Sequence, residues 1–138
     1  MVLKREVIKK IEYHFYNYEK EKKQIEEIAS DIAEASSYVL DLSGIHGTGI
    51  SDPTVRRAEL TEKKCHELRS WIKVVEATVK YFENDPRGEL AKRVYFKKES
   101  AAFIQNRLYI SERTFYTWKA DVINYAALKA CEAGMVKM

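Results

Sequence analysis

Residues 102–119 read AFIQNRLYISERTFYTWK, and this segment carries the clearest pattern in the chain. A helix-turn-helix motif needs an apolar residue in its first helix and two apolar residues across the turn. It also needs an N-cap residue, followed by apolar residues four and seven positions later, so that two helices pack at a steep angle. These positions are occupied by Ile104, Leu108, Ile110, Ser111, Phe115 and Trp118. The segment therefore predicts two short helices, with Ser111 as the N-cap of the second.

The outer face of the second helix consists of residue types that contact bases and phosphates in DNA. Arg113, in the first turn, has the chemistry for a bidentate contact with guanine. Arg107 and Lys119 are expected to contact phosphates. The predicted DNA-binding residues are Arg107, Ser111, Glu112, Arg113, Thr114, Tyr116, Thr117 and Lys119. The expected partner is double-stranded DNA.

A long helix is predicted in the N-terminal part of the chain. Apolar residues recur at spacings of three and four from Ile8 to Ile32, which predicts a helix over residues 3–36. Lys22 falls within this apolar stripe. A helix of that length is not stable through its own propensity, so we expect the stripe to pack against another element.

The next segment, residues 36–52, contains three of the chain's five glycines and predicts a loop. Asp52 followed by Pro53 is typical of a helix start, and the apolar residues that follow predict a second helix ending near Asn84. Two helices of similar length joined by one loop predict a long antiparallel hairpin, which we assign to residues 1–84. We expect this hairpin to pack on the C-terminal segment, on a second copy of the chain as a homo-oligomer, or on both.

Residues 85–138 predict shorter helices. Asp85-Pro86 repeats the cap-then-proline start of a helix that ends around Lys98, and another short helix precedes the turn at Leu108. The expected fold class is therefore all-α. It consists of the long hairpin of residues 1–84 followed by a small helix-turn-helix bundle, the DNA-binding domain, over residues 85–138.

Composition and charge exclude several classes of protein. The chain has 138 residues and a net charge of +3, too small an excess for DNA binding by charge alone. Residues 66–138 carry thirteen basic and nine acidic groups, so the C-terminal half is the positive one. No apolar run is long enough for a membrane span, and the start lacks the apolar core of a secretion signal. Cys65 and Cys131 stand singly, so we expect a cytoplasmic protein without disulfides.

No pattern for catalysis or for metal binding is present. Cys65 and His66 are adjacent, so on a helix they point about 100° apart, and no second ligand pair has a recognised spacing. The glycine run from Gly44 to Gly49 lacks the Lys-Ser/Thr of a phosphate-binding loop. We therefore expect no enzyme, no metal and no cofactor.

The sequence resembles the phage late-gene transcriptional regulators of the RinA and ArpU type. The likeness spans residues 50–125, and its motifs are Ser51-Asp52-Pro53-Thr54 with Ala58, Val94-Tyr95-Phe96, Phe103-Ile104, Leu108 to Tyr116, and Trp118-Lys119. The C-terminal half of that family looks like region 4 of bacterial sigma factors. The resemblance implies a sequence-specific regulator of phage or prophage late genes, acting in the cytoplasm of a bacterial host.

Two positions depart from the usual motif, and two other functions stay open. Gln105 stands where helix-turn-helix motifs have a small residue, and Tyr109 stands where they have glycine. Tyr109 requires either a turn without positive φ or local strain. A small terminase subunit would use the same motif on packaging DNA. A helical adaptor would instead bind a protein, for instance RNA polymerase, through Tyr116 and Trp118.

Overall fold

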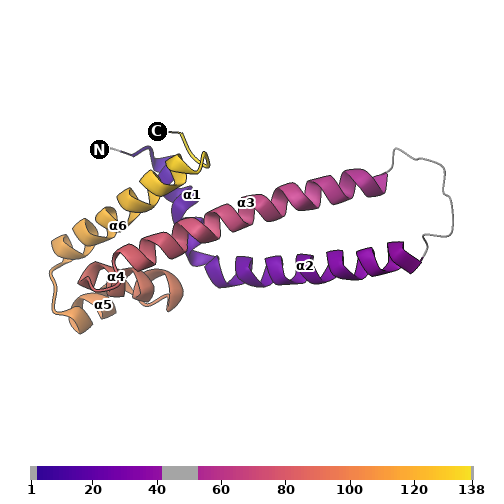
Figure 1. Ribbon diagram of the computed structural model, residues 1–138. Coiled ribbons are helices and arrows are strands. Elements are labelled where there is room, and N and C mark those ends of the chain that lie inside the picture. Colours follow the sequence, from indigo (N-terminus) through magenta and orange to yellow (C-terminus); the bar gives the residue numbers. More distant parts are fainter. Residues whose placement is uncertain (1–2, 42–52, 138) are drawn as a thin grey trace. The chain divides into compact units, whose positions relative to one another are not determined.

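The computed structural model describes the backbone of residues 3–41 and 53–137 and the side chains of residues 3–31 and 61–137. All regular secondary structure within these ranges is helical, which confirms the all-α fold class (Figure 1). The helices in chain order are α1 (Arg5–Tyr16), α2 (Tyr18–Asp41), α3 (Pro53–Tyr81), α4 (Pro86–Ala91), the π-helical turn η1 (Lys92–Phe96), α5 (Ala101–Leu108) and α6 (Glu112–Glu132).

The expectation of one continuous N-terminal helix is wrong, because the chain forms α1 and α2 with a break at Asn17. The backbone of Asn17 has φ −103° and ψ 13°, and its side-chain amide donates a hydrogen bond to the Tyr13 carbonyl oxygen at 2.7 Å. Asparagine side chains compete with the helical backbone for such partners and therefore favour helix ends. Lys22, which the heptad pattern places in the apolar stripe, is exposed.

The predicted loop over residues 36–52 begins too early, because α2 continues through Asp41. Residues 42–52, which include the predicted cap Asp52 and most of the glycines, lie outside the described residues. Beyond them, α3 begins at Pro53, in agreement with the proline signal. It ends at Tyr81, before the predicted end near Asn84.

The chain divides into two compact units whose bounds differ from the predicted 1–84 and 85–138. Unit 1 contains Met1–Tyr18 together with Ser70–Met138, and unit 2 contains Glu19–Arg69. Within unit 2, α2 and the first part of α3 run in opposite directions in Figure 1. The packing of their apolar stripes as a hairpin stays a prediction.

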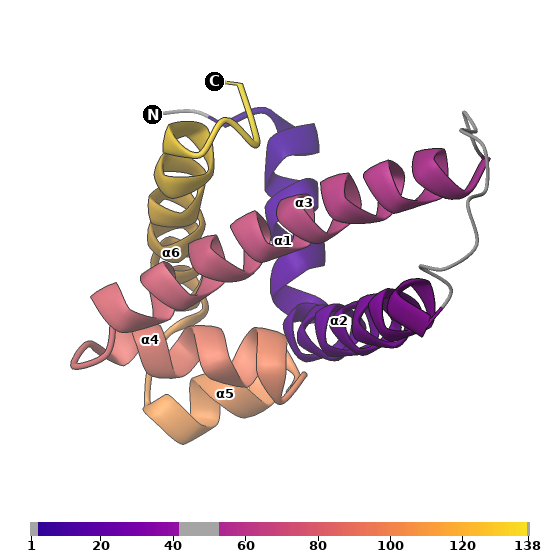
Figure 2. The same ribbon diagram turned by 45° about the vertical axis from the view of Figure 1, so that its right-hand side comes forward.

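The core of unit 1 combines α1, the end of α3 and all the helices that follow. Ile11 and Phe15 of α1 and Trp71 of α3 are fully or almost fully buried in the same cluster as the apolar residues of α6. Figure 2 shows α1 beside α6, with which it packs. The His14 ring stacks on Trp71 with centroids 4.0 Å apart. These contacts explain why α1 belongs to unit 1 rather than to a separate hairpin.

The segment between α3 and α5 contains a change of helix type. Asp85 caps α4 and Pro86 is its first residue, in agreement with the sequence signal. After Ala91 the helix widens into η1, where the Lys97 amide donates to the Lys92 carbonyl oxygen at 3.0 Å. Tyr95, within this π-helical turn, is fully buried.

Candidate nucleic-acid interface

Helices α5 and α6 and the short turn between them form the candidate site. Tyr109 ends α5 with φ 55° and ψ 47°, in the left-handed region that favours glycine. Of the two alternatives that the sequence leaves open, the structure therefore has the strained turn. Ser111 is the N-cap of α6: its hydroxyl oxygen accepts from the Thr114 amide at 3.1 Å, and its O–H donates to the Thr114 hydroxyl oxygen at 2.9 Å.

The apolar positions of the motif face the core. Ile104 and Phe115 are buried. The partly buried side chains packed against the same core include Leu108, Ile110 and Trp118. This packing leaves the opposite face of α6 free in its first two turns.

Most of the predicted contact residues lie on that face. The exposed ones are Arg107, Ser111, Glu112, Arg113, Tyr116 and Thr117, and Thr114 is half-buried beneath the cap. Among the described residues, the guanidinium groups of Arg107 and Arg113 form no ion pair. Two cations near the start of α6 are therefore available to an anionic partner.

Lys119 differs from the other predicted contact residues, because its ammonium group is paired inside unit 1. It lies 3.3 Å from Oε2 of Glu12 in α1. The same carboxylate oxygen accepts a hydrogen bond from the Tyr95 hydroxyl at 2.9 Å. Burial, and secondarily the negative charge of Glu12, raises the pKa of Tyr95, so its hydroxyl remains a donor. Sequence reasoning could not find Glu12, since no local motif connects it with Lys119.

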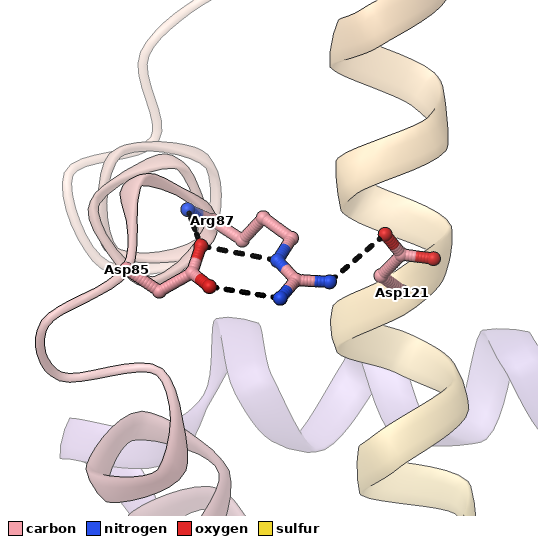
Figure 3. A network of polar contacts seen from close by, with 3 residues as sticks. All are labelled: Asp85, Arg87 and Asp121. Carbon is pink, nitrogen blue, oxygen red and sulfur yellow. Dashed lines mark hydrogen bonds and ion pairs between the residues drawn. The ribbon is translucent and has the colours of Figure 1, made fainter.

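A second polar network fastens the start of α4 to the middle of α6 (Figure 3). The Arg87 guanidinium donates to both carboxylate oxygens of Asp85, at 3.0 and 2.8 Å, and to Oδ2 of Asp121 at 3.2 Å. The hydrogen bonds from the Arg87 side chain and backbone lower the pKa of Asp85. The bonds to Asp85 and Asp121 raise the pKa of Arg87. The network orients α6 without using residues of its exposed face.

Beside the turn lies an open depression that sequence reasoning missed. It is lined by Arg93, Phe103, Asn106, Arg107 and Tyr109. Tyr109 is 95% exposed and Phe103 is 49% exposed. The sequence does show aromatic residues, Phe103 and Tyr109, at positions of the motif that are not expected to be buried. It does not show that both line one depression, because Tyr109 adopts the left-handed conformation there.

The described part of the chain has neither a metal-binding cluster nor a membrane-spanning helix. No group of three or more His, Cys, Asp or Glu side chains there is arranged to hold a metal ion. None of the helices within the described ranges is long and apolar enough to cross a membrane. Cys65 is buried, Cys131 is exposed, and neither forms a disulfide.

Comparisons with known proteins returned no relative. No family model, curated protein or solved structure matches this chain.

Proposed function

We propose that the chain binds double-stranded DNA in a sequence-specific manner, with α6 as the recognition helix of a helix-turn-helix. The observation that carries the proposal is the exposed start of α6. It presents Arg113, Tyr116 and Thr117 beside a capped N-terminus, while the apolar residues of the same helix are in the core.

The chemistry of this face suits the major groove. A planar guanidinium recognises the two acceptors of guanine, and one such contact contributes about 1–3 kcal/mol of discrimination. Helix N-termini favour phosphate groups because their amides and their dipole are positive. Arg107, which has no ion pair among the described residues, supplies a phosphate contact outside the recognition helix.

The biological role that we attach to this activity is regulation of phage or prophage late genes in a bacterial cytoplasm. It rests on the family resemblance of the sequence alone. The alternative function, a helical adaptor that binds a protein through Tyr116 and Trp118, is less well supported. Trp118 is partly buried against the core of unit 1 and is therefore less accessible to a partner.

The proposal is tested by selecting duplexes from a random library and measuring their affinity by fluorescence anisotropy at several salt concentrations. We expect Arg113→Ala to lose most of the preference for the selected duplex over a scrambled one. Arg107→Ala should weaken binding to both duplexes and reduce the salt slope by about 1. Both residues are exposed, so the melting temperature should not change.

Two variants serve as controls. Arg5→Ala removes the same charge from an exposed position of α1 and should leave the duplex preference intact. Lys119→Ala should leave the salt slope unchanged, because Glu12 already holds that ammonium group. Absence of salt-dependent binding to any duplex at low salt would contradict the proposed function.

A further inference from the structure

The turn before α6 holds Tyr109 in the left-handed conformation that ends α5. Tyr109 has φ 55°, where an L-residue is strained and glycine is not. Its side chain is 95% exposed, and within the described residues it forms no hydrogen bond or ring contact. Replacement by glycine would therefore relieve strain without the loss of a packing contact. What distinguishes Tyr109 is an exposed aromatic ring in a strained turn, which is the kind of position that contacts ligands in other proteins.

The neighbours of Tyr109 indicate what kind of ligand fits. Phe103 lines the same depression, is half-exposed and has no ring partner among the described residues. Aromatic faces that are open to solvent stack on nucleic-acid bases once these are outside a duplex. Asn106, an exposed amide on the same wall, has the donors and acceptor that pair with a base edge.

Two arginines line the depression, and among the described residues only one of them forms ion pairs. Arg93 donates to Glu89 at 3.0 Å and to Glu99 at 3.2 Å, so its charge is balanced within the protein. Arg107 has no such partner in the described residues and lies at the same depression. The phosphate of a nucleotide whose base stacks in the depression could therefore form an ion pair with Arg107.

We propose that this depression binds an unpaired nucleotide of single-stranded DNA, stacked on Tyr109 and Phe103 with its phosphate at Arg107. This inference rests on the proposed function, because it assumes that the partner of the protein is DNA. It adds a second contact surface, on α5 and the turn, that recognises a strand rather than a duplex.

The test compares binding of a 12-nucleotide oligothymidine and of the selected duplex by anisotropy, together with thermal melting. We expect Tyr109→Gly to raise the melting temperature and to weaken oligothymidine binding about tenfold, a typical loss for one stacked base. Tyr109→Phe keeps the aromatic face and should bind the strand like the wild type. Phe103→Ala should also weaken strand binding, whereas Arg113→Ala should affect only the duplex.

The outcomes separate this inference from the proposed function. Wild-type protein that binds the duplex but not the oligothymidine would overturn the inference alone. Unchanged strand binding by Tyr109→Gly would also overturn it. Tighter binding of a 12-residue acidic peptide than of the oligothymidine, lost in Tyr109→Gly, would assign the depression to a protein partner instead. Loss of the preference for the selected duplex in Arg113→Ala would support the proposed function whichever of these outcomes is found.

Discussion

Residues of the same chemical type have different roles in α6 because of their position around the helix. Lys119 lies four residues after Phe115 and three before Val122, both of which are buried, so its backbone position faces the core side. Its ammonium group reaches Glu12 there. Arg113 lies on the opposite side and stays exposed. The position around the helix therefore separates a lysine that is paired within the protein from an arginine that is open to a partner.

Trp118 shows the same rule for an aromatic residue. It is partly buried against the core of unit 1, so truncation removes apolar contacts and leaves a space that the helices cannot fill completely. We expect Trp118→Ala to reduce the free energy of unfolding by roughly 2–3 kcal/mol, measured by urea denaturation. Tyr116→Ala is the matched control, because Tyr116 is 52% exposed and should cost far less. Equal midpoints for wild type and Trp118→Ala would show that Trp118 is not a core residue.

At the scale of elements, the short helix α4 follows α3 and packs on α6. Its start is defined by Asp85, whose carboxylate accepts from the Arg87 amide at 2.9 Å as an N-cap. Its body lies close to the end of α3 at Gly88, and Arg87 reaches across to Asp121 in α6. The first turn of α4 therefore combines a local N-cap by Asp85 with a tertiary contact from Arg87 to α6.

The Asp85–Arg87–Asp121 network predicts a dependence of stability on pH. The pKa of Asp85 is lowered in the folded protein, chiefly by its hydrogen bonds with Arg87, so ionised Asp85 stabilises the fold. This contribution is complete above the unfolded-state pKa of about 3.9 and is lost as the pH falls through the lower folded-state pKa. Because the side chains are about a third exposed, we expect it to be on the order of 1 kcal/mol.

Asp85→Asn isolates this charge, because asparagine is an equally good N-cap. We expect the variant to melt below the wild type at pH 6 and the difference to shrink as the pH approaches 2. A difference that is constant over this range, measured by circular dichroism, would contradict the assigned role of the charge.

Gly88 is required by the close approach of α4 to the end of α3. A Cβ atom at this position would overlap the Phe82 carbonyl oxygen and lie 2.9 Å from its carbon, and the backbone cannot move aside without shifting the helix. We expect Gly88→Ala to reduce the free energy of unfolding by about 2 kcal/mol, despite the higher helix propensity of alanine. A rise in the melting temperature would show that the two backbones are not in contact.

At the scale of the whole molecule, the candidate DNA-binding helices share their core with α1 and the end of α3. Phe15 of α1 contacts Tyr95 with ring centroids 5.2 Å apart, and Tyr18 donates a hydrogen bond to Glu76 at 3.0 Å. Residues 85–138 alone would leave these apolar surfaces in water. The packing of α5 and α6 therefore depends on residues from both ends of unit 1.

This dependence predicts the behaviour of two shortened chains. A fragment of residues 85–138 should lack a cooperative thermal transition by circular dichroism, because it lacks Ile11, Phe15 and Trp71. A chain in which a flexible Gly/Ser linker replaces residues 19–69 should retain one, because it keeps all of unit 1. Cooperative melting of the short fragment would show that α1 and α3 are dispensable for the fold.

Local signals in the sequence were sufficient for the helical class, the turn before α6 and its cap. Ser111, Pro53 and Asp85-Pro86 act through hydrogen bonds and backbone restrictions within a few residues, so their effect can be predicted without knowledge of the fold. The exposed side of α6 also followed from residue spacing. Most of the candidate contact face was therefore predictable.

Contacts between distant residues determined the remaining features. The assignment of α1 to the core of α6, the pairing of Lys119 with Glu12 and the hydrogen bond from Tyr95 to the same carboxylate all involve residues far apart in sequence. Heptad spacing shows that a stripe must be buried but not which surface buries it, since apolar contact is not directional. The left-handed conformation of Tyr109 likewise required the structure, because this conformation favours glycine and the residue type alone does not predict it for a tyrosine.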